Sequence, residues 1–175
     1  FSPENLLEIY PLRADLEAVS PRAAATRIAA ETLARLEALI GVMREAAAQA
    51  DHRAHVDADY AFHQAIIKAS GNRMLQHVWQ TMRLATTTFV THSMTQLTHR
   101  SLQEIGERHV PVLEALRTRD PNLAEAAMRR HIEEPGDWIR YAIIAADKAL
   151  AAVVDQQVET PPTHDEPGAA VTDVD

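Results

Sequence analysis

The chain has 175 residues, of which 46% are hydrophobic, and this is enough apolar material for one compact core. Seventeen lysines and arginines against 25 aspartates and glutamates leave a net charge of −8, so we do not expect the chain by itself to neutralise the phosphates of DNA. The absence of cysteine excludes a disulfide scaffold, a thiolate metal site and a cysteine nucleophile. No apolar run reaches the roughly 18 residues of a membrane span, and we expect a cytoplasmic protein without membrane partners.

Apolar residues recur at helical spacing from the start of the chain. They predict a bent first helix over about residues 3–29, in which Pro11 removes a backbone donor and Ser20-Pro21 breaks, kinks or restarts the helix. A second amphipathic helix is expected over about 33–50. A third, which carries Tyr60, should stop at Gly71, where glycine can take the left-handed conformation of a helix end.

The second half of the chain shows clear helix boundaries. A long helix is expected over about residues 74–96, and Ser101 with Glu104 forms a capping box ahead of the next one. Asp120-Pro121 marks the start of a further helix, which Pro135-Gly136 should interrupt before a last helix that carries Trp138.

No segment alternates as a strand would, so the predicted fold class is all-α. We expect an antiparallel bundle of about six to seven helices with a central metal or effector pocket. This domain should span residues 1–154. Residues 155–175, which are rich in proline and acidic side chains and lack an apolar period, should form a disordered tail.

Three histidines stand on the apolar faces of predicted helices. His109 and His131 are each surrounded by aliphatic residues at helical spacing, and Asp59 precedes His63 by the four residues that bring two side chains together. A buried polar group without a partner costs roughly a few kcal/mol, and one divalent cation would satisfy all four groups. Three imidazoles and one carboxylate suit zinc, nickel, iron or another borderline metal, and we expect zinc or nickel.

An alternative interpretation is that each of these histidines is a satisfied core residue and that Asp59 is solvated. The remaining histidines carry less weight. His77 and His92 are left open, and four others fall in predicted connections or in the tail and should face solvent: His52, His55, His99 and His164.

Four segments together resemble a known family over about residues 5–150. It is the FCD domain, the C-terminal effector domain of FadR-type GntR transcription regulators. The resemblance implies that Asp59, His63, His109 and His131 bind a divalent metal inside an all-helical bundle. The segments are LRADLE (12–17), DYAFHQAIIKASGN (59–72), ERHVPVLEALRTRDP (107–121) and AEAAMRRHIE (124–133).

The resemblance also implies a function in regulation. In this family a small effector, usually a carboxylate such as an organic or sugar acid, enters the bundle and alters DNA binding by an N-terminal winged helix. No basic helix-turn-helix precedes Phe1, so we expect an effector-binding domain, acting as a homodimer, that reaches DNA only through a missing N-terminal domain.

Three residues are candidates for contact with the effector. Arg13 matches the family's first-helix arginine and could hold a carboxylate through two hydrogen bonds, although it could equally lie on the surface. Arg83 and Asn72 are weaker candidates, and Asn72 could serve only to close its turn. Proline at 11, 111 and 135 departs from the family pattern, so effector specificity cannot be transferred.

Two other functions use the same residues. A metal-assisted hydrolase would need an open metal position and a general base, but the sequence has no H-E-x-x-H motif, no G-x-S-x-G elbow and no carboxylate placed as a base, so we expect no enzyme. A structural or dimerising bundle whose metal only ties helices together is the second alternative. Stabilisation by an effector would distinguish a sensor from it.

Overall fold

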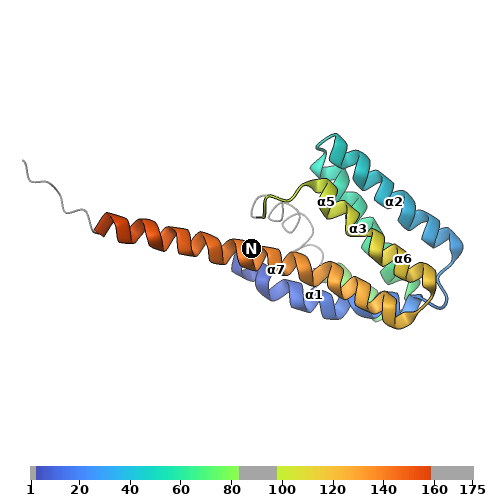
Figure 1. Ribbon diagram of the computed structural model, residues 1–175. Helices are drawn as coiled ribbons and strands as arrows, with labels where there is room; N and C mark the ends of the chain where they lie inside the picture. The colour runs from blue at the N-terminus through green and yellow to red at the C-terminus, as the bar shows by residue number, and fades with distance from the viewer. Residues whose placement is uncertain (1–2, 83–97, 159–175) are drawn as a thin grey trace, which may run out of the picture. The chain divides into compact units, whose positions relative to one another are not determined.

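The computed structural model describes residues 3–82 and 98–158 (Figure 1). Within them the fold is all-α, as predicted, and contains no strand. Residues 1–143 form one compact unit and residues 144–175 a second; the site described below lies in the first. The helices are α1 (Pro3–Ala24), α2 (Ala30–Ala48), α3 (His52–Ala69), a helical stretch over 73–82, α5 (Leu102–Glu107), α6 (Val110–Thr118) and α7 (Pro121–Val158).

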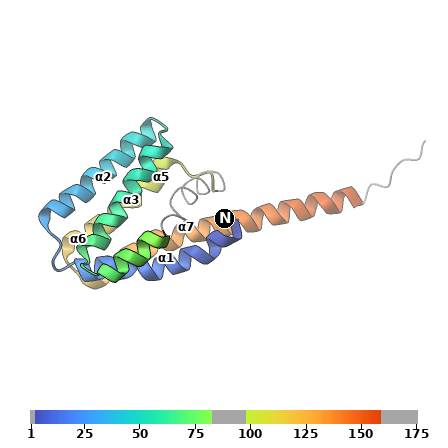
Figure 2. The same cartoon turned by 180° about the vertical axis from the view of Figure 1, so that it is seen from behind.

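The helices of the first unit pack in antiparallel pairs. Ion pairs join Arg22 to Glu125 and Asp15 to Arg129, so positions that advance along α7 meet positions that recede along α1. α2 lies along α3, a pairing that both views show, and α2 also packs against α5 and α6 (Figures 1 and 2). No helix of the described chain is both long and apolar enough to cross a membrane.

One buried cluster of apolar side chains joins these helices. It takes residues from α1, α2, α3, α6 and the first part of α7, so burial of a common core holds the bundle together. Its largest fully buried apolar members include Leu36, Met43, Phe62, Leu116 and Met128.

The helix ends predicted from sequence are confirmed. α3 stops before Gly71, which has a φ of +67°. Ser101 and Glu104 form a capping box at the start of α5. The carboxylate of Asp120 accepts hydrogen bonds from the backbone N–H of Asn122 and Leu123 at the start of α7.

The first helix is neither broken nor restarted at Ser20-Pro21, two of the three outcomes expected there. Pro21 has no N–H to donate to the carbonyl of Glu17, four residues earlier. The buried Ser20 hydroxyl donates to that carbonyl instead, at 2.7 Å. α1 therefore continues through Pro21 to Ala24, and it also runs through Pro11, which lies on its exposed side.

Replacing Ser20 by alanine should destabilise the fold by about 1–3 kcal/mol, because the carbonyl of Glu17 then has no donor in a buried place. Urea denaturation of the single mutant and of Ser20→Ala/Pro21→Ala would measure the loss. Pro21→Ala restores a backbone N–H, so Ser20→Ala should cost much less in that background. An equal cost in both backgrounds would contradict this account.

The expected interruption at Pro135-Gly136 does not occur either. α7 runs from Pro121 to Val158 with Pro135 inside it. Pro135 leaves the carbonyl of His131 without its usual donor, and the guanidinium of Arg108 donates to that carbonyl at 3.2 Å and to the carbonyl of Arg130 at 3.3 Å. A side chain from another part of the bundle thus keeps the helix intact.

The helix that starts at Leu102 is instead divided in two. α5 ends at Glu107, and α6 begins at Val110 with Pro111 in its first turn, where proline's missing N–H would not be used. His109 stands at the N-terminal boundary of α6. The break therefore places His109 at a corner of the backbone.

Candidate metal and effector site

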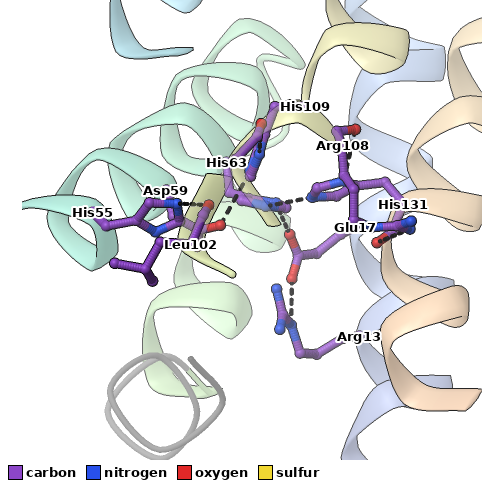
Figure 3. A network of polar contacts seen from close by, with 10 residues as sticks. Arg13, Glu17, His55, Asp59, His63, Leu102, Arg108, His109 and His131 are labelled. Atoms are coloured by element: carbon purple, nitrogen blue, oxygen red, sulfur yellow. Dashed lines mark hydrogen bonds and ion pairs between the residues drawn. The ribbon is translucent and has the colours of Figure 1, made fainter. Parts of the chain in front are cut away.

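Three of the four predicted metal ligands meet in the interior of the first unit (Figure 3). His63 comes from the middle of α3, His109 from the corner between α5 and α6, and His131 from α7. One ring nitrogen from each lies within 4.8 Å of those of the other two. His63 and His109 are buried and His131 is half-buried.

The Nδ1 atom of each ring faces an oxygen that can only accept a hydrogen bond. Nδ1 of His63 lies 2.6 Å from a carboxylate oxygen of Glu17, that of His109 lies 3.0 Å from the carbonyl of Gly106, and that of His131 lies 3.1 Å from the carbonyl of Arg108. Each Nδ1 must therefore carry the proton, and in a neutral ring Nε2 then presents its lone pair. Hydrogen-bonding partners of this kind orient the imidazoles that bind metals.

The Nε2 atoms of His63 and His131 are close enough to share one cation. Nε2 of His63 and Nε2 of His131 are 3.2 Å apart, and two lone pairs at this distance repel each other unless a proton or a cation lies between them. Nε2 of His109 is buried and has no hydrogen-bond partner among the described residues. Nitrogens bound to one zinc ion at about 2.0–2.1 Å lie no more than about 4 Å apart, so the spacing of the His63 and His131 nitrogens fits this ion.

Asp59 is the fourth predicted ligand, and it lies beside His109. Its Oδ1 is 3.0 Å from Nε2 of His109, without hydrogen-bond geometry. Burial raises the pKa of Asp59, but contact with His109 and the charges of His63 and Arg13 outweigh burial. The pKa is therefore below its ordinary value, and the carboxyl is ionised. The group thus brings a negative charge to the side of the histidine cluster.

Glu17 is a buried carboxylate that the sequence analysis did not assign to the site. One oxygen accepts from Nδ1 of His63 and the other accepts from Nε of Arg13 at 2.8 Å (Figure 3). Burial raises the pKa of Glu17, but Arg13 and His63 outweigh burial and hold it at about 2. Glu17 therefore links the predicted effector residue to a predicted metal ligand. It lies four residues after Arg13 on one face of α1, and this spacing was the available signal.

The surroundings shift the pKa values of His63 and His131 in opposite directions. Burial lowers the pKa of His63, but the charge and hydrogen bond of Glu17 raise it above its ordinary value. The pKa of His131 is well below its ordinary value, because the ring is removed from solvent and lies beside His109 and His63. His131 is thus a neutral ligand with its lone pair available.

Arg108 holds His131 from two directions. Its backbone carbonyl accepts from the imidazole, and its guanidinium donates to the carbonyl of His131 and to Glu134. The guanidinium also lies over the ring of Trp138, 4.6 Å from the centroid. This residue was likewise missed from sequence, because its partners lie more than twenty residues away.

Of the other two candidates for effector contact, the described structure places only Asn72, and it does not bring that residue to this cluster. Asn72 is exposed and directly precedes the helical stretch over 73–82. Its side-chain oxygen accepts a hydrogen bond from the backbone N–H of Leu75, in the first turn of that stretch. Arg83 lies outside the described residues, as do His92 and His164. His52, His77 and His99 are exposed, and this agrees with the prediction for the first and the last.

The prediction that His55 faces solvent is wrong. Its side chain is fully buried, and Nε2 lies 3.0 Å from the carbonyl of Leu102. α3 begins at His52, so position 55 already belongs to its inward face, one turn before Asp59. His55 connects α3 to the start of α5 and is not one of the three gathered histidines.

The fold and the site define an all-α domain built around a buried histidine cluster. The model of the FCD domain matches residues 8–134, and the chain belongs to this family. It is 30% identical over 132 residues to a probable D-xylose utilization operon transcriptional repressor of Paenarthrobacter nicotinovorans, covering 74% of this chain and 55% of that protein. It is also 30% identical over 138 residues to the Glc operon transcriptional activator of Escherichia coli K12, covering 74% of this chain and 53% of that protein.

A solved structure of Streptococcus agalactiae GntR is similar to this fold. It superposes with a TM-score of 0.62 at 25% identity, covering 78% of this chain and 60% of that one. The chain spans about half the length of the curated relatives named above. These relatives are transcription regulators, in agreement with the prediction of a regulatory domain that is not an enzyme.

Proposed function

We propose that this chain is a metal-dependent sensor of small carboxylates within a transcription regulator. The observation that carries the proposal is the set of three Nδ1 contacts, which leaves each Nε2 available, in a cluster where one ring nitrogen of each histidine lies within 4.8 Å of those of the other two. Buried imidazole nitrogens without a partner cost free energy unless a ligand binds to them. Membership of the FCD family also supports a sensing function.

His63, His109, His131 and Asp59 would hold the metal, and zinc or nickel suits their donor atoms. When bound, the ion supplies an electrophilic position that an anion can occupy. Three neutral imidazoles and the carboxylate of Asp59 leave a divalent ion with about one net positive charge, and Glu17 and Arg13 compensate each other nearby. An acid is therefore the class of ligand that completes the charge balance.

Arg13 would receive the effector's free carboxylate oxygens. Glu17 holds its Nε, and neither Nη has a hydrogen bond to another described residue. The side chain is only 14% exposed, so the interpretation of Arg13 as an ordinary surface residue has little support. A guanidinium fixed through Nε can present both Nη groups to one carboxylate.

Organic and sugar acids should bind the metal-loaded chain and lose binding when a chelator removes the metal. Isothermal titration calorimetry of the 175-residue chain with and without chelator is the measurement. Arg13→Ala should weaken the best acid by about 1.5–3 kcal/mol, the value of a hydrogen bond to a charged group. Arg35→Ala, at an exposed position on α2, should have no effect.

Thermal unfolding with zinc and with each acid separates the sensor from a purely structural metal. If zinc raises the unfolding midpoint but no acid does so, the metal only ties the helices together. Arg13→Lys keeps the positive charge, so it distinguishes loss of the planar guanidinium from loss of the ion pair with Glu17. Binding that survives removal of the metal, or a preference for uncharged ligands, would refute the proposal.

We further propose that effector binding controls a winged-helix DNA-binding domain in the whole regulator, and that the regulator works as a homodimer. The relatives, which are transcription regulators about twice as long as the matched region, support this view. The net charge of −8 supports assigning DNA contact to another domain.

A further inference from the structure

The hydroxyl of Tyr10, on α1, is buried without a partner among the described residues. Tyr10 is 3% exposed, and its hydroxyl has no hydrogen bond within the described part of the chain. The ring lies close against α7 at Gly136, where an added Cβ would stand 2.8 Å from Cβ of Tyr10. Glycine at 136 therefore makes room for Tyr10, and the tyrosine cannot easily move aside.

The surroundings of Tyr10 connect it to the histidine cluster. Tyr10, Arg13 and Glu17 follow at spacings of three and four on one face of α1, and Cζ of Arg13 lies 5.8 Å from the centroid of the Tyr10 ring. Burial raises the pKa of Tyr10, and the charges of Arg13, Asp59 and Arg108 also act on it. The hydroxyl is therefore a neutral donor at physiological pH and lies within electrostatic reach of the site.

These three charged neighbours each belong to the environment of one histidine. Arg13 reaches His63 through Glu17, Asp59 contacts His109, and Arg108 accepts from His131. A buried donor among such groups costs free energy unless a ligand or another polar group satisfies it. The guanidinium of Arg13 can donate hydrogen bonds but cannot accept them, whereas a phenol hydroxyl can both donate to and accept from an alcohol.

We propose that Tyr10 is a specificity residue of the effector site, whose hydroxyl bonds to a second oxygen group of the acid beside the one that Arg13 holds. The ligand class is then a hydroxy acid rather than a simple carboxylic acid. A site built to bond a ligand hydroxyl discriminates strongly against the analogue that lacks it, because its own polar group is left unpaired. This inference rests on the proposed function and narrows its ligand.

The first test needs no ligand. Tyr10→Phe removes only the hydroxyl, and the unfolding midpoint of the zinc-loaded variant should equal or exceed that of the unaltered chain, because no hydrogen bond is lost. Tyr141→Phe, at a 70% exposed position, is the matched control. A fall in midpoint for Tyr10→Phe but not for Tyr141→Phe would show that the folded chain already satisfies the hydroxyl, and it would overturn the inference.

The second test uses succinate, malate and tartrate, which share two carboxylates and carry none, one and two hydroxyls. Calorimetry of the zinc-loaded unaltered chain should give at least about tenfold tighter binding to a hydroxylated member than to succinate, and Tyr10→Phe should abolish the difference. Equal preferences in both proteins would refute the role of Tyr10 and leave the proposed function standing. If the unaltered chain binds none of the three acids, the proposed function fails for this ligand class, and the inference fails with it.

Discussion

Replacing His109 by alanine is expected to remove the metal from the chain and to lower its stability. The change deletes an Nε2 ligand and removes a fully buried ring that packs edge-on against Phe62. Loss of a metal present at a hundredfold excess over its dissociation constant costs about 2.7 kcal/mol, and the cavity left by the buried ring lowers the stability further. Metal content after dialysis and thermal unfolding with zinc would measure both effects.

His77→Ala is the matched control, because His77 is exposed. Unfolding in the presence of a chelator separates the two contributions to the loss, since the unaltered chain then also lacks metal and only the cost of the lost buried ring remains. Retention of stoichiometric zinc by His109→Ala would show that the three histidines do not act as one site.

Glu17→Gln should also have a large effect, although Glu17 is not expected to touch the metal. The carboxylate accepts from both His63 and Arg13, whereas an amide turns a donor toward one of them. Loss of such a supporting partner typically lowers metal affinity 10–100-fold, and breaking a buried ion pair costs about 3–5 kcal/mol. Competition with a chromophoric chelator gives the first quantity and urea denaturation the second.

Glu8→Gln serves as the control on the same helix, because Glu8 is exposed. Glu17→Asp adds a further comparison: it keeps the charge but shortens the side chain, so it should retain part of the ion pair and lose the 2.6 Å contact to His63. If Glu17→Gln binds zinc as tightly as the unaltered chain, Glu17 does not orient His63.

Helix starts and ends were predictable from sequence because each depends on a few neighbouring residues. The capping box at Ser101 and Glu104 and the left-handed Gly71 are local devices, and both are present. The prolines were misjudged for the opposite reason. Whether a proline breaks a helix depends on what replaces the missing donor, and at Pro135 that donor is Arg108, 27 residues away in sequence.

The gathering of the three histidines followed from their positions on apolar helix faces, together with the family resemblance. Periodicity identified which side chains point inward, but it could not say what they meet there. The environment of His63 depends on Glu17 from another helix, 46 residues away in sequence, and the burial of His55 depends on where α3 begins. A charged residue on the inward face of a helix, such as Glu17, indicates a partner for a buried histidine, and a search limited to histidines would miss it.

The contact between Arg108 and the carbonyl at His131 gives Pro135 a positive role. An ordinary residue at 135 would offer its own N–H to that carbonyl and compete with the guanidinium for it. Proline leaves the acceptor open, so the residue next to His109 in sequence can hold the backbone of His131 as well as its ring. Two candidate ligands on separate helices are thereby joined mechanically, and a displacement of either one would be transmitted to the other before any ion is bound.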